Sequence, residues 1–564
     1  MPGLLSTERI TAPPEFNRWR ILPAAIAIHL CIGSIYAWSI YNPALIRTLG
    51  IVTSAPDDWS LRQVVWVFTA AIITAGLAAA AAGRWLEILG PRKIGLIAAG
   101  CWGGGYLVGG AGILTHQLWL LYLGYGVIGG TGLGLGYISP IGTLLKWFPD
   151  RRGLASGMAI MGFGGGALIG APLKEFFIRM FYKAPEYLGA VDQLNLITES
   201  GRRYARIAGE RIEAVIVNAA EAAHMIVPGP EGVYAVGAGS TGVAQTFFAM
   251  GTLYLVIMVA AVLALRIPAP GWKPKDRVPE TESGTGKNTL VTQHHVNVDE
   301  ALKTRQFYLL WVVFCLSITG GVGILGVANT MIQDIFGTTL PGIVDAAFAS
   351  TYVIMISVFN TLGRIFWSSC SDYIGRKYTY GIFFVAGILL YGSIPYCAHA
   401  VSVNPSVVWL VCFYAATMIT FSMFGGGFAT LPAYIADLFG TRHVAGIHGR
   451  LMTAWSASSV LGPLAITSLR EHAVNRSIDK LVSEIDPQLF ARTFGAGIEE
   501  LEQLVDTHTV TLAKLTELAP HGTVDPTPYL YNSTLYLMAA LLVIGLICNA
   551  LMTQVKPVHF MCDN

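Results

Sequence analysis

The chain has 564 residues, of which 54% are hydrophobic and 12% are charged, and its formal net charge is +2. Its mean hydropathy of +0.56 leaves little room for a separate soluble domain, so we expect the function among apolar segments. A nearly neutral chain without a basic patch argues against a nucleic-acid partner. The eight cysteines follow neither a disulfide framework nor a metal-site spacing.

The apolar residues gather in runs that are long enough to cross a bilayer, for which a helix needs about 20 apolar residues. We predict an all-α membrane protein with twelve transmembrane helices, six on each side of a polar stretch. The predicted spans are 19–44, 63–83, 94–113, 117–145, 154–176, 244–265, 306–333, 345–368, 378–399, 407–435, 445–469 and 533–554.

The short loops predict the orientation of these helices. Basic residues follow the second, fourth, eighth and tenth runs, whereas the short loops after the third, seventh and ninth runs carry no Lys or Arg. Because positively charged loops stay in the cytoplasm, both termini are predicted to be cytoplasmic. The first 18 residues contain no apolar core, so no cleaved signal peptide is expected. We expect an integral, multi-pass protein of the inner or plasma membrane.

The same pattern predicts the domains, including one long polar insertion after the fifth helix of each half. Residues Ile498, Leu501, Leu504 and Val505 of the second insertion share one apolar helical face. The two insertions together could form a small cap, or they could be disordered or partner-binding loops. The predicted parts are a cytoplasmic segment 1–18, a first half 19–265 with insertion 177–243, a cytoplasmic linker 266–305, a second half 306–554 with insertion 471–532, and a cytoplasmic tail 555–564.

The two halves repeat one another. Glu87 and Asp372 are 285 residues apart, as are Gly90 and Gly375, and each pair lies in a charged loop after the second helix of its half. Parallel six-helix repeats are a transporter architecture in which the substrate site lies between the halves. Carboxylates and basic residues in these loops can pair, so they form either a gating latch or a simple membrane anchor. The latch residues that we predict are Glu87, Arg92, Asp372 and Arg376.

Small residues recur every four positions in two of the predicted helices. Gly162, Gly166 and Gly170 in the fifth helix, and Ala454, Ser458 and Gly462 in the eleventh, predict faces on which another helix packs closely. The segment 130–136 superficially resembles a dinucleotide loop, but it lies in an apolar run with no strand before it. Close helix packing is the better interpretation of these glycines.

The charged loops after the second and eighth helices resemble the signature of the major facilitator superfamily. Three further segments, 146–157, 363–376 and 436–442, resemble the oxalate/formate antiporter family, whose relatives include the monocarboxylate transporters. The resemblance covers the twelve helices but does not obviously cover the two insertions. It implies a secondary carrier with alternating access.

Arg364 in the eighth span is the main candidate for a substrate ligand, because charge in hydrocarbon is costly and usually functional. Asn360 precedes it by one helical turn. Arg364 could instead reach the cytoplasmic edge or pair with the latch. In the family that the chain resembles, an arginine of the eighth helix binds the substrate carboxylate, and Gly363-Arg364 matches its motif. A guanidinium fork can donate two parallel hydrogen bonds to a carboxylate.

Two departures from the family narrow the expected substrate. Oxalate carriers of the family have a second cation, a lysine in the eleventh helix, where this chain has Trp455. One buried cation balances one carboxylate, so a monocarboxylate is favoured and a dicarboxylate exchanger is the alternative. Related proton-coupled carriers have an aspartate where this chain has Asn360, and an amide cannot bind and release a proton in the working range.

Other residues of the spans are weaker candidates. His29 in the first helix titrates near neutrality and is a possible proton site, although a packed hydrogen-bond donor is the simpler interpretation. Aromatic side chains could shape the substrate cavity or could merely pack against helices and lipid. These are Tyr36, Trp38, Tyr137, Phe428 and Trp455.

These patterns favour a secondary active transporter of small organic anions, most plausibly monocarboxylates, that works by exchange or ion coupling. A receptor or sensor on a carrier fold is the competing class, and a channel is a third. The insertions contain no nucleophile–base pair, metal cluster or phosphate loop, so we expect neither an enzyme nor a cofactor or metal. The expected partners are a small carboxylate and the lipid bilayer, and the protein is expected to function as a monomer.

Overall fold

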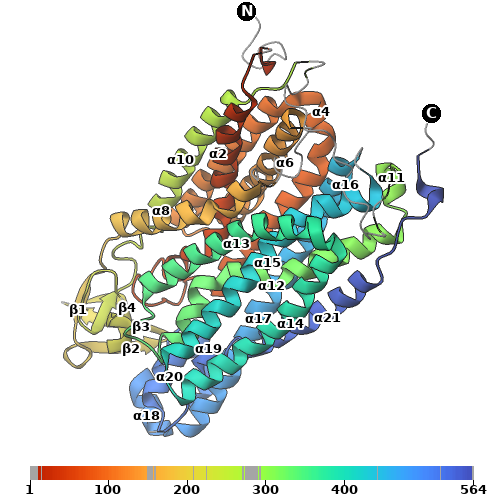
Figure 1. Cartoon of the computed structure of the whole chain (residues 1–564). Helices are drawn as coiled ribbons and strands as arrows, with labels where there is room; N and C mark the ends of the chain where they lie inside the picture. The colour runs from red at the N-terminus through yellow and green to blue at the C-terminus, as the bar shows by residue number, and fades with distance from the viewer. Residues whose placement is uncertain are drawn as a thin grey trace, which may run out of the picture.

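A computed structural model of the chain describes residues 10–13, 15–148, 157, 160–207, 209–223, 225–269, 272, 290, 292, 294–440, 443–520 and 522–561. Figure 1 shows two helical bundles side by side, the first in red to yellow-green and the second in green to blue. Ten helices of the described residues are long and apolar enough to cross a membrane. The predicted fifth and eleventh spans correspond to two further helices, α8 and α17.

The first half contains helices at each of the predicted spans. Its elements are η1 (Arg18–Ile21), α2 (Leu22–Gly33), η2 (Ser34–Ile40), α3 (Asn42–Leu45), α4 (Leu61–Leu114), α5 (Leu118–Leu121), η3 (Tyr122–Gly129), α6 (Gly130–Trp147), α8 (Gly166–Phe181) and α10 (Val243–Ala264). Helix α4 holds the second and third spans, which are joined at a kink. The first span changes from an α-helix to a 3₁₀-helix after Gly33, and η3 is a π-helix within the fourth span. Such irregular turns are frequent at functional sites.

The second half has longer and more regular helices. Its elements are α12 (Arg305–Phe336), α13 (Ala346–Ile374), α14 (Arg376–Val403), α15 (Val407–Phe439), α16 (Val444–Leu451), α17 (Thr453–Glu484) and α21 (Asn532–Ala550). Many apolar side chains on the outer faces are exposed, among them Leu389 at 70% and Val411 at 59%. An apolar outer surface of this kind is suited to contact with lipid.

Glycine conformations support the predicted repeat. Gly90 ends the second span with φ 76° and ψ 165°, and Gly375 ends the eighth with φ 88° and ψ 148°. Residues with a side chain rarely adopt this conformation, so a glycine is required at both equivalent turns. The sequence similarity therefore reflects the same turn between the second and third helices of each half.

The small-residue faces form the expected close helix contacts. A methyl group at Gly166 would collide with the backbone of Gly33, so the fifth and first helices touch. A methyl group at Gly462 would collide with Gly323, which gives the same contact between the eleventh and seventh helices. Residues 130–136 belong to α6, which packs against α4, as the helix-packing interpretation predicts.

The insertion of the first half contains an antiparallel sheet that the sequence analysis did not predict. Its strand order is β1-β5-β4-β3-β2. Ser200 and Gly201 both have positive φ, at 51° and 76°, which produces the tight hairpin between β2 and β3. The elements are β1 (Tyr187–Gly189), η4 (Val191–Gln193), β2 (Asn195–Glu199), β3 (Arg202–Ile207), β4 (Glu210–Val217), α9 (Ala219–Ala223) and β5 (Gly232–Ala235).

The insertion of the second half is helical and has its own apolar core. Leu504 is buried in this core, and Ile498, Leu501 and Val505 pack against it, which confirms the predicted apolar face. Its elements, apart from the end of α17, are α18 (Pro487–Phe494), η5 (Ile498–Glu500), α19 (Leu501–Asp506), α20 (Leu512–Leu518) and η6 (Thr527–Tyr529).

The two insertions lie at one end of the bundles, and the described residues at either end of the linker lie at the other (Figure 1). At the linker end, Thr11 pairs with Ile267, and Val296 pairs with Phe560 of the C-terminal segment. This end also contains α11 (Val298–Ala301) and η7 (Pro557–His559). The two ends of the described chain therefore lie beside the described ends of the linker. This arrangement is expected if both termini and the linker are on the same side of the membrane. The identity of that side stays a prediction.

The Gly90 turn can be tested separately from packing. Added methyl groups at Gly90 and at Gly100, which lies within helix α4, would both meet open space. We expect Gly90→Ala to destabilise the protein by about 1–3 kcal/mol because its φ is positive. Gly100→Ala should be neutral or stabilising by up to about 1 kcal/mol. Thermal unfolding in detergent measures both, and equal effects would show that the turn does not require glycine.

Candidate substrate site

Arg364 is completely buried in helix α13, where the two halves meet. Its Nε donates to Oδ1 of Asn360 at 3.1 Å, so the predicted pair is in contact. Nη1 and Nη2 have no hydrogen-bond partner among the described residues. The Tyr36 hydroxyl lies close enough to interact with the guanidinium, but it does not meet the geometry of a hydrogen bond. The side chain thus holds two unused donors in the protein interior.

Helix packing brings Arg364 close to the first half. A methyl group at Gly164 would lie 2.8 Å from Arg364 Nε, so glycine at this position provides space for the guanidinium. Beside it, Ser357 of α13 donates to the carbonyl of Gly164 at 2.6 Å. Arg364 therefore lies at a direct contact between the fifth and eighth helices.

Aromatic side chains from both halves surround this arginine. Its guanidinium carbon lies 5.5 Å from the ring centre of Phe428 and 5.9 Å from that of Phe163. Trp455 contacts both rings, with centroid distances of 5.6 and 5.9 Å. We call the following set the Arg364 cluster: Arg364, Asn360, Tyr36, Tyr137, Phe163, Phe424, Phe428 and Trp455.

The structure thus places five of the predicted aromatic and polar candidates, Asn360, Tyr36, Tyr137, Phe428 and Trp455, in one cluster with Arg364. Sequence analysis missed Phe163 and Phe424, because an aromatic residue in an apolar run carries no signal of its direction. Trp455 is only 1% exposed, which excludes a lipid-facing position. Trp38 lies elsewhere, packed on Tyr125 at 4.6 Å inside the first half.

A second intramembrane cation, Lys174 of α8, was missed by the sequence analysis. It is completely buried and donates to the carbonyls of Ser34 and Ala37 at 2.8 and 3.2 Å. Its ammonium also lies 4.6 Å above the ring of Tyr41. These carbonyls belong to the irregular 3₁₀ segment η2, so Lys174 stabilises the break in the first helix. A lysine near the end of an apolar run was the available signal.

His29 is buried beside Tyr137, the neighbouring member of the Arg364 cluster. Its Nδ1 lies 3.0 Å from the carbonyl of Ala25, and its Nε2 lies 3.2 Å from the carbonyl of Tyr137. A neutral imidazole has one N–H and can donate to only one of these carbonyls, whereas a protonated ring can donate to both. The possible proton site therefore lies next to the candidate substrate site, and its role stays a prediction.

The predicted latch residues that are described make contacts within one half. Arg376 forms ion pairs with Asp372 and with Asp437 of α15, the latter at 3.7 Å. Arg92 donates to the carbonyls of Leu263 and Leu265 at the end of α10. The side chain of Glu87 lies outside the described residues. The gating role of this set stays a prediction.

Arg92 also has a counterpart in the second half that the sequence analysis did not identify. Lys377, which is 285 residues after Arg92, donates to the carbonyls of Ala550 and Met552 at 2.8 and 3.0 Å. In each half, a basic residue that follows the repeated glycine turn therefore caps the last turn of the sixth helix. Cations at this position also interact favourably with the helix dipole.

Comparison with known proteins agrees with this fold. A sequence profile of the Major Facilitator Superfamily matches residues 25–191 and 232–463. The chain belongs to the major facilitator superfamily. It is a membrane transporter with multiple membrane-spanning helices, and the family resemblance seen in the sequence is confirmed.

Several relatives are carriers of carboxylates by name. The chain is 24% identical to the oxalate:formate antiporter of Oxalobacter formigenes, over 79% of this chain and 83% of the relative. It is also 24% identical to apicoplast pyruvate carrier 1 of Toxoplasma gondii, over 80% and 84% of the two chains. Monocarboxylate transporter 11 of Homo sapiens is 29% identical over 32% of this chain and 36% of its own length.

Solved structures support the fold. A bacterial homologue of the human lysosomal transporter Spinster, in an inward-facing state, superposes with a TM-score of 0.55 at 12% identity, covering 96% of this chain and 99% of that one. A bacterial homologue of the iron transporter ferroportin gives a TM-score of 0.52 at 10% identity, covering 94% and 98% of the two chains.

The equivalent caps predict equivalent losses of stability. We expect Arg92→Met and Lys377→Met each to lower the free energy of unfolding by about 1–3 kcal/mol, because each removes charged hydrogen bonds to a helix end. Lys303→Met is the control, since Lys303 forms an exposed pair with Glu300, and should leave the stability nearly unchanged. Thermal unfolding in detergent measures the stability of each variant. A loss of stability in only one of the Arg92 and Lys377 variants would contradict the equivalence of the two caps.

Proposed function

We propose that the protein carries small monocarboxylates by alternating access, and that Arg364 binds the substrate carboxylate. The observation that carries this proposal is a fully buried guanidinium with two unpaired terminal nitrogens. No carboxylate of the described chain forms an ion pair with it. A buried charge without a counter-ion is costly, and a bound anion would offset that cost.

The shape of the Arg364 cluster supports a small, planar anion. Nε is already bound to Asn360, so Nη1 and Nη2 remain as a parallel pair of donors for two carboxylate oxygens. The surrounding rings offer apolar contacts for the rest of a small substrate. These rings come from both halves, so a bound substrate would contact both.

Charge supports a monocarboxylate over a dicarboxylate. Lys174 is another buried cation among the described residues, but its ammonium is bound to carbonyls inside the first half and is not part of the Arg364 cluster. Trp455 occupies the place where an oxalate carrier of the family would supply a lysine. A dicarboxylate exchanger stays the alternative, because one relative is an oxalate:formate antiporter.

Burial of Arg364 implies a moving carrier. With the guanidinium closed off from solvent, a substrate reaches it only when the halves separate at one end. Rocking of parallel six-helix repeats around a central site provides this access. Transport by exchange needs no coupled proton, whereas His29 beside Tyr137 offers a place for one.

Loss of the guanidinium should abolish binding. We expect Arg364→Gln to weaken monocarboxylate binding on the order of 100-fold, since two charged hydrogen bonds disappear. Arg364→Lys should weaken it about tenfold, because the charge remains but the fork is lost. Uptake of labelled monocarboxylates into proteoliposomes and substrate-induced thermal stabilisation measure these effects.

Two further variants make this test specific. Arg179→Gln removes an exposed arginine that is paired with Glu175 and should leave uptake unchanged. Asn360→Asp places a carboxylate beside Arg364 Nε, and this carboxylate should compete with the substrate for the guanidinium. It provides an independent test if Arg364→Gln folds poorly. Wild-type affinity in Arg364→Gln would exclude Arg364 as the ligand.

Charge balance can be tested at position 455. Trp455→Lys should shift the preference from monocarboxylate towards oxalate by about 1–3 kcal/mol, because the second carboxylate then finds a partner. Competition of both ligands for uptake by the wild type and the variant measures the shift. A wild type that already prefers oxalate would contradict the single-cation argument.

A further inference from the structure

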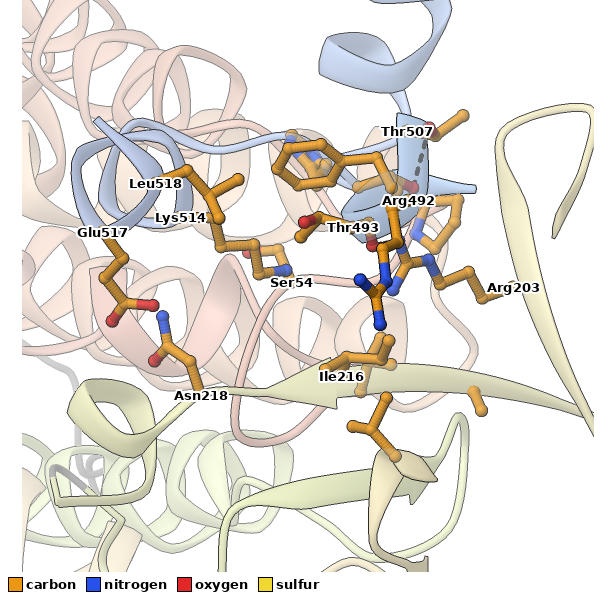
Figure 2. A pocket seen from close by; sticks show the side chains of 17 residues that line it. Ser54, Arg203, Ile216, Asn218, Arg492, Thr493, Thr507, Lys514, Glu517 and Leu518 are labelled. Atoms are coloured by element: carbon orange, nitrogen blue, oxygen red, sulfur yellow. Dashed lines mark hydrogen bonds between the residues drawn. The ribbon is translucent and has the colours of Figure 1, made fainter. Parts of the chain in front are cut away.

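The two insertions line a pocket of about 260 Å³ that includes no residue of the Arg364 cluster (Figure 2). Its walls come from strands β3 and β4, from helices α18 and α20, and from the loop before α4. The main polar side chains that line it are Arg203, Asn218, Arg492, His508, Lys514 and Glu517.

The pocket lies at a contact between the two halves of the carrier. The first insertion follows α8 of the first half, and the second follows α17 of the second half. Arg203 donates to the carbonyl of Thr493 at 2.7 Å, and Thr509 donates to the carbonyl of Gly201 at 2.6 Å. The pocket can therefore keep its shape only while these insertions stay together.

The two arginines of the pocket, Arg203 of β3 and Arg492 of α18, differ from other arginines of the sheet. Arg202 is paired with Asp57 at 2.8 Å, and Arg211 is paired with Glu199 at 2.7 Å. Neither Arg203 nor Arg492 has an ion pair within the described part of the chain, and Arg203 Nε is buried without a hydrogen-bond partner. Figure 2 shows the side chains of Arg203 and Arg492 among the residues that line the pocket.

The other charged groups of the pocket balance one another. Burial lowers the pKa of Lys514 and Arg203 lowers it further, whereas Glu221 and Glu517 raise it. Figure 2 shows Glu517 beside Asn218 on the side of the pocket opposite the two arginines. Burial lowers the pKa of Arg203, and burial also lowers the pKa of His508. An anion bound at Arg203 would oppose this effect of burial on its guanidinium.

We propose that this pocket binds a small oxyanion, a carboxylate or a phosphate, between Arg203 of the first half and Arg492 of the second. Guanidinium groups donate paired hydrogen bonds to either anion. A bound anion that contacts both arginines would join the two insertions, so it favours closure at the insertion end. This mechanical effect depends on the proposed alternating access, whereas the binding does not.

The test uses the full chain with Arg364→Gln, which removes the proposed substrate site. Inorganic phosphate, acetate and oxalate are added separately at millimolar concentration, and thermal unfolding and hydrogen exchange are followed. We expect at least one anion to raise the unfolding temperature by a few degrees and to slow exchange in both β3 and α18. Comparison of the three anions distinguishes a phosphate from a carboxylate site.

A second substitution then tests the arginines. Adding Arg492→Gln should weaken the effective anion about tenfold or more, and it disturbs no hydrogen bond that is described. Arg211→Gln, on the same sheet but outside the pocket, should leave the response unchanged. No stabilisation by any of the anions, an equal loss in both variants, or protection of only one insertion would overturn the proposal. Failure of monocarboxylate transport alone would leave these results unaffected.

Discussion

A positive charge buried between two helical bundles without a counter-ion is the constraint on which this carrier depends. Arg364 is fully buried, and its terminal nitrogens have no partner in the described chain. Taking a guanidinium out of water costs several kcal/mol, which packing and other contacts elsewhere must offset. The folded protein tolerates this cost, but a bound anion would reduce it. This gain in free energy can drive selective binding.

The surrounding structure holds the guanidinium of Arg364 against residues of both halves. Gly164 leaves space for the guanidinium, and Ser357 ties α13 to the first half beside it. Rings from both halves exclude water around Arg364, which strengthens its interaction with an anion. The same burial prevents access in this conformation, so binding and movement of the halves are linked.

Hydropathy and internal repeats were sufficient to predict the twelve helices and the two halves. The cost of a charge in the membrane and the family resemblance singled out Arg364, which the structure buries between the halves, while its role as a ligand stays a prediction. They could not give the direction of each side chain. Tyr36 and Trp38 are two residues apart, and residues at this spacing do not share a helix face, so Tyr36 reaches the Arg364 cluster while Trp38 packs on Tyr125. Lys174 was missed because a lysine near a span end resembles one that reaches the membrane surface. The sheet of the first insertion was missed because its short strands are only partly buried and depend on contacts with one another and on tight turns.

A structure of the protein with a saturating monocarboxylate tests the role of Arg364 most directly. We expect both carboxylate oxygens to lie within hydrogen-bond distance of Nη1 and Nη2, inside the ring formed by Phe163, Phe428 and Trp455. A carboxylate bound at another place, with the terminal nitrogens of Arg364 still unpaired, would contradict this account.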